Sequence, residues 1–400
     1  MFALLVLALP LALGDDRGSW PQWRGLNRDG VAHNVWLPRN WLEREPHVRW
    51  RVSVGEGYST PLIAGNRVFT FGRVQASEVI QSHDLATGKV LWRSAYLAPY
   101  EARDIARSHG AGPRATPILR EGLLFTFGIN EVLHALDATT GQVLWRIDFS
   151  RRFGTEPPGY GACSSPILVG RLLIVPAAER VFAVDWRSGS IVWQALHDSF
   201  FSSLILASFD GELQLVAFAR YRLVGLDPNR GRLLWSHRYP SMWGSNVITP
   251  VVWQDRVIVS SPTQGARALQ VSRKNGEWQT RAAWGTPSFR AYLTSPVVHE
   301  DHMYGLDESG RLHCIDLRTG RTAWSHGNFG DFGTLVRAGD QLLILNGYGE
   351  ITMFEATPRG FREQGQREVA NSATWAHLVV VPGSLLVRDK NELTCFDLSS

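Results

Sequence analysis

The sequence is poor in cysteine and in lysine. Its three cysteines, Cys163, Cys314 and Cys395, form no CxxC pair, so the disulfide framework of small secreted domains is not indicated. Lysine occurs at only three positions, the net charge of the 400 residues is +4, and no run of five like charges occurs. The sequence therefore lacks the basic arm of many nucleic-acid-binding proteins, and we expect no nucleic-acid partner.

Long apolar runs and the short motifs of common enzyme classes are also missing. After the N-terminus no segment has 18 continuous apolar residues, so we expect no transmembrane segment. The sequence contains no GxSxG elbow, P-loop, HExxH or EF-hand pattern. The stretch His299-Glu300-Asp301-His302 resembles a metal cluster in isolation. It occupies a polar hairpin turn on which adjacent side chains diverge, so we interpret it as an exposed turn.

The first 14 residues, MFALLVLALPLALG, form an apolar run of signal-peptide length that ends in small residues. The run is too short to span a bilayer, and no cysteine that carries a lipid directly follows it. The sequence therefore predicts a signal peptide at residues 1–14, a mature chain that starts near Asp15, and a periplasmic or secreted location.

What the sequence does have is tryptophan, at 16 positions, and a repeat that uses it. The segment DLATGKVLW at 84–92 recurs at 137–145, 185–193, 227–235 and 316–324. Weaker copies begin at Ser272, where Gly276 holds the glycine position, and at Glu355 and Asp397, so eight copies follow at spacings of 39 to 53 residues. In each copy Asp and Gly favour a tight turn, and the strand that follows carries the Trp.

A second signal precedes each copy. Thr-Pro or Ser-Pro pairs stand at 60–61, 116–117, 165–166, 249–250 and 295–296, with looser versions at 203–204, 334–335 and 377–378. Each pair leads into two short apolar runs separated by a polar turn, so each repeat has the pattern of four strands. We therefore predict an all-β, eight-bladed β-propeller of four-stranded blades, which forms one domain over residues 48–400.

The segment before the first repeat indicates how the ring closes. The last copy stops at Ser400 without an outer strand, whereas VRWRVSV at 48–54 has strand character and no blade of its own. Pairing the two completes blade eight and removes an exposed sheet edge. We expect large rings to pack between neighbouring blades at Trp50, Trp92, Trp145, Trp193, Trp235 and Trp324. Residues 15–47 are an N-terminal extension for which we expect a place across the ring exterior or toward a neighbouring molecule.

The DxxTGxxxW element with its preceding Thr/Ser-Pro strand resembles the PQQ-like propeller repeat of quinoprotein dehydrogenases. The same repeat builds the BamB-type scaffold of the machinery that assembles outer-membrane β-barrels. The resemblance covers residues 48–400, and WPQWRGLNRDG at 20–30 resembles the mature start of many exported bacterial proteins with such propellers.

The resemblance to dehydrogenases implies PQQ held against adjacent cysteines, with calcium on Glu, Asn and Asp and a catalytic Asp. The sequence has no adjacent cysteines, and the calcium-binding and catalytic positions are not matched. We therefore expect no catalytic residue, no metal and no cofactor, and PQQ with calcium belongs only to the alternative in which the protein is such an enzyme.

In a ring of this kind, the loops from each outer strand to the next inner strand border one mouth of the central channel. The residue three positions before each Pro or its equivalent is expected there, which gives Tyr58, Arg114, Cys163, Phe201, Val247, Leu293, Phe332 and Trp375. Two interpretations stay open. The side chains form an aromatic rim that grips an extended peptide or a flat ring, or they fill the channel by packing.

Two long loops at the same mouth add charge. The loop 97–114 carries Arg103, Arg107, His109 and Arg114, and the loop 151–163 carries Arg151, Arg152 and Tyr160. We predict a partner surface here for an acidic or carboxylate-bearing ligand, with solvated loop charge as the alternative. Cys163 would be a nucleophile only in hydrogen-bond contact with His109 and an orienting group, so we interpret it as a buried or mildly reactive thiol.

These patterns favour an exported, monomeric, non-catalytic propeller that acts as a scaffold for envelope or secreted proteins or peptides. One alternative is a PQQ-dependent, dehydrogenase-like oxidoreductase with an altered site. Another is a protein that binds a small ligand at the channel mouth without turnover.

Overall fold

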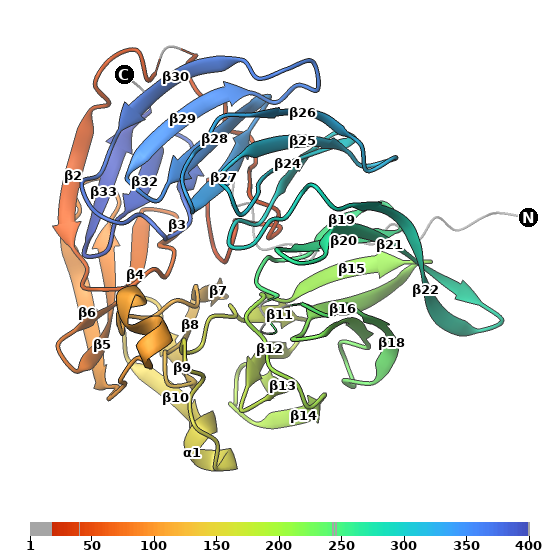
Figure 1. Cartoon of the computed structure of the whole chain (residues 1–400). Coiled ribbons are helices and arrows are strands. Elements are labelled where there is room, and N and C mark those ends of the chain that lie inside the picture. The colour runs from red at the N-terminus through yellow and green to blue at the C-terminus, as the bar shows by residue number, and fades with distance from the viewer. Residues whose placement is uncertain (1–17, 40, 242–243, 245, 399–400) are drawn as a thin grey trace, which may run out of the picture.

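The computed structural model describes residues 18–39, 41–241, 244 and 246–398, so the predicted signal peptide lies outside the described residues. Eight sheets stand around a central axis like the blades of a propeller (Figure 1). The prediction of an all-β, eight-bladed propeller is confirmed. The two named helices, η1 (Asp104–His109) and α1 (Phe149–Phe153), are short, and no helix of the described residues could cross a membrane.

The strands of a blade follow in chain order from the channel outward. The first four blades are β3 (Leu62–Ala64), β4 (Arg67–Val74), β5 (Ser77–Asp84), β6 (Val90–Leu97); β7 (Ile118–Arg120), β8 (Leu123–Phe127), β9 (Val132–Asp137), β10 (Val143–Asp148); β11 (Ile167–Val169), β12 (Leu172–Ala177), β13 (Arg180–Asp185), β14 (Ile191–Ala195); and β15 (Ile205–Phe209), β16 (Glu212–Phe218), β17 (Arg222–Leu226), β18 (Leu233–Arg238).

The next three blades follow the same plan. They are β19 (Val251–Trp253), β20 (Arg256–Ser261), β21 (Gly265–Lys274), β22 (Glu277–Thr286); β23 (Val297–His299), β24 (His302–Leu306), β25 (Leu312–Asp316), β26 (Thr322–His326); and β27 (Gly333–Ala338), β28 (Gln341–Asn346), β29 (Glu350–Glu355), β30 (Glu363–Glu368). Blade 8 contains β31 (Val379–Val381), β32 (Ser384–Arg388) and β33 (Glu392–Asp397).

The ring closes through its N-terminal strand, as predicted. Strand β2 (Val48–Ser53) pairs antiparallel with β33 and becomes the outer strand of blade 8, with Trp50 opposite Cys395. Arg49 adds an ion pair to Asp397 at 3.2 Å. The two ends of the propeller are therefore held in one sheet, and β33 is not left as an exposed edge strand.

The repeat motif makes a contact between neighbouring blades. In blade 3, Asp185 Oδ1 accepts hydrogen bonds from the backbone of the turn, and Gly189 has a φ of +73°. The ring of Trp145, from blade 2, covers this glycine so closely that a Cβ there would lie 2.9 Å from the ring. Nε1 of Trp145 donates a hydrogen bond to Trp186 O at 3.2 Å. Trp50, Trp92 and Trp324 donate in the same way to the next blade, at 2.8, 3.0 and 2.9 Å.

This contact predicts that Gly189→Ala destabilises the protein more than Gly170→Ala. Both glycines lie in blade 3 with positive φ, but a Cβ on Gly170 meets nothing within 4 Å. The extra loss for Gly189→Ala is expected to be about 1–2 kcal/mol, because the ring of Trp145 must move. Urea denaturation of both variants measures it, and equal unfolding midpoints would contradict the proposed role of the glycine.

Blade 5 departs from the expected repeat. Ser272 and Gly276 do not form the motif turn, because β21 and β22 are ten residues each and continue to a tip at Asn275–Gly276 (Figure 1). The tryptophan that contacts the next blade is Trp284, whose Nε1 donates to Leu317 O at 2.7 Å. In blade 5 the hairpin is longer, so the Trp that contacts the next blade lies farther from the turn in sequence, but the contact itself is kept.

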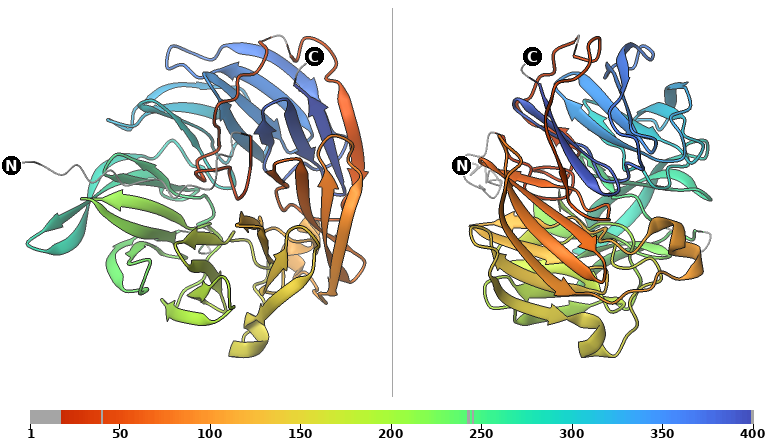
Figure 2. Two further views of the ribbon diagram at one scale, coloured as in Figure 1. Left: turned by 180° about the vertical axis from the view of Figure 1, so that it is seen from behind. Right: turned by 90° about the vertical axis from the view of Figure 1, so that its left-hand side faces the viewer.

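The channel is filled by the chain itself. Residues 18–37, called the plug below, run inside the ring, which the expectation for residues 15–47 missed. Farther along, Trp41 and Leu42 lie against the outer part of blades 7 and 8, as expected for a segment on the ring exterior. Figure 2 (left), which views the ring from behind, shows the plug crossing the centre. Trp20 forms a β-bridge with Ile63 of blade 1, and Trp23 Nε1 donates to Thr249 Oγ1, next to blade 5, at 3.0 Å.

The plug enters and leaves on the same face of the ring. Gly18 lies beside Pro382 in the turn between β31 and β32. The returning strand β1 (Val31–Ala32) runs parallel to the last residues of β27. Residues 24–30 form the tip between these two limbs, at the opposite end of the inner strands, where each inner strand begins.

Two buried arginines fix the tip of the plug. Arg28 donates to Leu204 O at 3.1 Å, to Pro166 O at 2.8 Å and to Ser165 O at 3.2 Å, which joins blades 3 and 4. Arg24 donates to Pro296 O of blade 6. Burial lowers the pKa of Arg24 to about 10 and that of Arg28 to about 9, so both stay charged at neutral pH. The carbonyls directly before the inner strands β11, β15 and β23 therefore receive charge-assisted hydrogen bonds.

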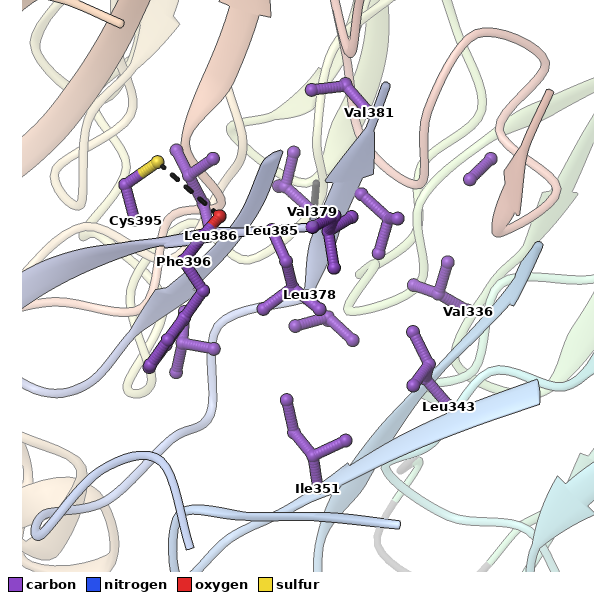
Figure 3. Close-up of a cluster of buried hydrophobic side chains, with 14 of the residues drawn as sticks. Val336, Leu343, Ile351, Leu378, Val379, Val381, Leu385, Leu386, Cys395 and Phe396 are labelled. Atoms are coloured by element: carbon purple, nitrogen blue, oxygen red, sulfur yellow. Dashed lines mark hydrogen bonds between the residues drawn. The ribbon is translucent and has the colours of Figure 1, made fainter. Parts of the chain in front are cut away.

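Between blades, the core combines aliphatic side chains with aromatic rings, and between blades 7 and 8 the aliphatic side chains predominate. Figure 3 shows Val336, Leu343 and Ile351 of blade 7 facing side chains of blade 8. Cys395 belongs to this cluster, and Cys314 lies in the core between blades 6 and 7. Burial raises the pKa of these two thiols to about 11 and about 12. Both are free cysteines in the core.

Candidate functional site at the channel mouth

A cavity of about 320 Å³ lies where the inner strands begin, and we call it the mouth cavity. The structure brings all eight residues at the counted positions to its wall: Tyr58, Arg114, Cys163, Phe201, Val247, Leu293, Phe332 and Trp375. His109 and Tyr160, from the two long loops, join them. Each blade thus contributes at least one side chain to a single cavity.

The Thr/Ser-Pro motif explains this convergence. At four positions of the motif or its looser version, the hydroxyl accepts a hydrogen bond from the backbone of the preceding blade. These bonds are Thr60 N to Thr116 Oγ1 at 3.3 Å, Thr116 N to Ser165 Oγ at 2.9 Å, Ser165 N to Ser203 Oγ at 3.0 Å and Thr249 N to Ser295 Oγ at 2.9 Å. These bonds hold the starts of successive inner strands at one level. Counting back three residues from each proline therefore reaches the same level in every blade.

Aromatic rings form a continuous band along one side of the cavity, while Val247 and Leu293 line the other side. Trp375 lies 5.0 Å from Tyr58, 4.7 Å from His109 and 5.9 Å from Phe332 between ring centroids. Tyr160 continues the band, at 5.6 Å from His109 and 6.0 Å from Phe201. These separations are those of favourable aromatic pairs, so the rings support one another and leave their remaining faces toward the cavity.

The floor of the cavity was not predicted from the sequence. It contains Trp23 from the plug and His377 from the start of blade 8, whose rings pack at 5.4 Å in an edge-to-face arrangement. His377 Nδ1 donates to Leu378 O at 2.9 Å, because a carbonyl can only accept. Burial, with a contribution from the charge of Arg24, lowers the pKa of His377 to about 3, so the ring is neutral and its Nε2 carries a lone pair.

Arg114 is the one residue with a permanent charge among the described residues that line the cavity. Its Nη2 donates to Gly110 O at 3.0 Å. Burial lowers the pKa of His109, and the charge of Arg114 adds to this effect, so His109 is neutral at neutral pH.

Cys163 shows no sign of activation. Burial raises the pKa of its thiol, and its Sγ donates to the carbonyls of Tyr160 and Gly161 and not to a base. A protonated thiol that points its proton at carbonyl oxygens is a poor nucleophile. The cavity wall therefore lacks a nucleophile–base pair among its described residues.

Arg103 and Arg107 lie outside the mouth cavity. Arg103 pairs with Glu156 at 2.9 Å, and Arg107 pairs with Asp104 at 2.9 Å, all four side chains being more than half exposed. The charges of Arg103 and Arg107 are thus paired in solvent, while Arg151 and Arg152, in α1, do not line the cavity either. The cationic character of the cavity comes from Arg114 and not from a broad basic rim.

The donor set does not fit PQQ with calcium. No Asp or Glu occurs among the described residues that line the cavity, and its single cysteine has no cysteine beside it. In the part of the chain that the structure describes, no group of three or more His, Cys, Asp or Glu side chains could hold a metal ion. Calcium requires several oxygen ligands, which these walls do not offer.

A family model described as outer membrane protein assembly factor BamB matches residues 75–326, more than half of the chain. The chain belongs to this family. A relative carrying the name BamB from Shewanella oneidensis is 22% identical over 315 residues, which cover 76% of this chain and 67% of the relative. A BamB relative from Yersinia pestis is 23% identical over 56% of this chain and 61% of its own. The alignments thus span about two thirds or less of the relatives' length.

Solved structures agree with the BamB-family fold. BamB from Moraxella catarrhalis superposes with a TM-score of 0.61 at 15% identity, over 87% of this chain and 98% of that one. A europium-containing methanol dehydrogenase superposes with a TM-score of 0.55 at 12% identity, over 96% and 98%. At these identities the likeness shows the fold alone, which BamB proteins and dehydrogenases share.

Proposed function

We propose that this BamB-family propeller is a non-catalytic scaffold of the cell envelope that binds a polypeptide partner at its mouth cavity. The observation that carries the proposal is the convergence of all eight inter-blade loops on one aromatic cavity. Aromatic residues and arginine dominate the binding energy of protein interfaces, and rings held by packing lose little entropy when a partner binds.

The chemistry of the cavity supports binding over turnover. Its described residues contain no activated nucleophile and no carboxylate that could act as a general base or hold calcium. The plug closes the channel beneath it, so a ligand meets a floor of Trp23 and His377 and does not pass through. We expect that no resident cofactor is needed, and that incubation with PQQ and calcium produces no bound chromophore.

The names of the relatives indicate the process in which a partner would take part. They are assembly factors for outer-membrane proteins, so we propose that the partner belongs to that process, either a component of the assembly machinery or a client protein. We further propose a periplasmic, monomeric protein, which fits the sequence-predicted signal peptide.

Replacing Tyr58 and Trp375 together by Ala is expected to weaken capture of envelope proteins by about tenfold or more, because both rings belong to the aromatic band. Trp36→Ala is the control. Trp36 is 73% exposed and lies beside Gly339, at the end of β27 away from the cavity. Cross-linking in intact cells, followed by mass spectrometry, measures the capture. Equal capture by the double variant and the control, with both proteins folded, would remove the mouth as the binding site.

A further inference from the structure

We propose that the mouth cavity binds an aromatic ring that carries a carboxylate, as at the C-terminal residue of a polypeptide or in a free aromatic acid. This inference rests on the proposed function and names the chemical group that the same site recognises. Three properties of the cavity carry it: its size and walls, its single cation, and a hydrogen-bond acceptor in its floor.

The size and walls fit one ring. The cavity volume of about 320 Å³ is at the lower end of small-molecule sites, which run from about 300 to about 1,000 Å³. Its wall is a band of rings around Trp375, with Tyr58, His109 and Phe332 in contact with it. A flat aromatic group gains both apolar burial and edge-to-face packing there, whereas an aliphatic chain gains the burial alone.

The charge of the wall favours an anion. Aromatic walls by themselves attract cations, but Arg114 repels a cation and no described lining residue is a carboxylate that could pair with one. Nη2 of Arg114 is already bonded to Gly110 O, and the guanidinium lies near the Tyr100 hydroxyl, while Nη1 is buried and makes no hydrogen bond of normal length and angle. A carboxylate supplies the missing acceptor, in the forked geometry that guanidinium favours.

The floor adds a preference for a ring with a donor. His377 is 4% exposed, and its Nε2 makes no hydrogen bond. Because Nδ1 carries the proton, Nε2 is an acceptor. A phenol hydroxyl or an indole N–H can satisfy this atom and the phenyl ring cannot, so tyrosine or tryptophan is expected to bind more tightly than phenylalanine.

Titration calorimetry on the full-length mature protein tests the proposal with matched pairs of ligands. The probes are N-acetyltyrosine against N-acetyltyrosinamide, and an unstructured decapeptide ending in Tyr as the free acid against the same peptide amidated. The acids are expected to bind about tenfold or more tightly than the amides, since the carboxylate makes a charge-assisted bond. If the peptide acid binds and the free acid does not, the source is a chain terminus; comparable binding of both indicates a free aromatic acid. Either result supports the shared chemistry.

Arg114→Met is expected to reduce the ratio of acid to amide affinity to about one while leaving ring binding in place. Arg107→Met serves as the control, because the Arg107 side chain lies outside the cavity. This variant is expected to keep the ratio of acid to amide affinity of the unmodified protein. Equal affinity of acids and amides for the unmodified protein overturns the proposal. If the Tyr58/Trp375 double variant still loses its protein partner in that case, the mouth remains the partner site, so failure of this inference is distinct from failure of the proposed function.

Discussion

Arg28→Met is expected to lower the free energy of unfolding by about 3–5 kcal/mol. The guanidinium of Arg28 donates to the carbonyls of Ser165, Pro166 and Leu204 from inside the channel. Methionine fills similar space but leaves these buried acceptors without donors, and each unsatisfied acceptor costs about 1–3 kcal/mol. The loss is large for a single residue because it opens contacts to two blades at once.

Equilibrium denaturation in urea measures this loss. Arg39→Met is the matched control, because Arg39 follows the plug in the same segment and is exposed, so its variant is expected to stay within about 0.5 kcal/mol of the parent. Coincident unfolding curves for the two variants would show that the plug merely rests in the channel and does not hold the blades together.

Trp50→Ala is expected to cost about 3–5 kcal/mol, the range for removing a large buried ring. Trp50 is 7% exposed, donates from Nε1 to Leu85 O at 2.8 Å and covers Gly88 of blade 1. It also sits in the strand that pairs with β33, so the substitution weakens both the contact between blades 8 and 1 and the closure of the ring.

Thermal and urea unfolding of Trp50→Ala are to be compared with Trp36→Ala, which removes a ring that is 73% exposed and is expected to change stability by less than about 0.5 kcal/mol. In Trp50→Ala, the rate of amide hydrogen exchange is also expected to increase more in β2 and β33 than in the strands of the other blades. Uniform exchange across all blades, with little loss of stability, would mean that closure does not depend on this tryptophan.

The repeat made most of the fold predictable. Asp, Gly and Trp at fixed offsets mark a turn, a positive-φ position and a ring that packs toward the next blade. The hydrogen bond from the Trp to the next blade recurs at Trp50, Trp92, Trp145 and Trp324, whereas Trp235 bonds to Gln214 of its own blade. Closure followed from counting, because blade 8 lacked an outer strand that residues 48–54 could supply. Blade 5 was misplaced because an elongated hairpin separates Trp284 from the usual spacing, and the extra residues keep a normal strand pattern.

The plug could not be predicted in the same way. It occurs once, so no repeat indicates its place, and its arginines have the pattern of solvated surface. Their partners are backbone carbonyls at positions 165, 166, 204 and 296, which carry no side-chain signal. The two tryptophans of WPQWRG, three positions apart, were the one indication that the segment is buried.

The wall of the mouth cavity followed from the sequence because Thr/Ser-Pro sets the level of each inner strand, and the residue three positions earlier shares that level. The floor did not, since Trp23 reaches it from the plug and His377 is a core histidine whose role depends on the tautomer fixed by Leu378 O. Whether these residues bind a partner remains a prediction for both wall and floor.

The central claim is that a polypeptide partner is held at the mouth cavity, above the plug. The most direct test places a photo-reactive amino acid at Leu293, a partly exposed lining residue, and separately at Trp36 on the far face, in protein exported by living cells. The account predicts an envelope-protein adduct from Leu293 that disappears when Trp375 is changed to Ala, and none from Trp36. An adduct formed from Trp36 but not from Leu293 would contradict it.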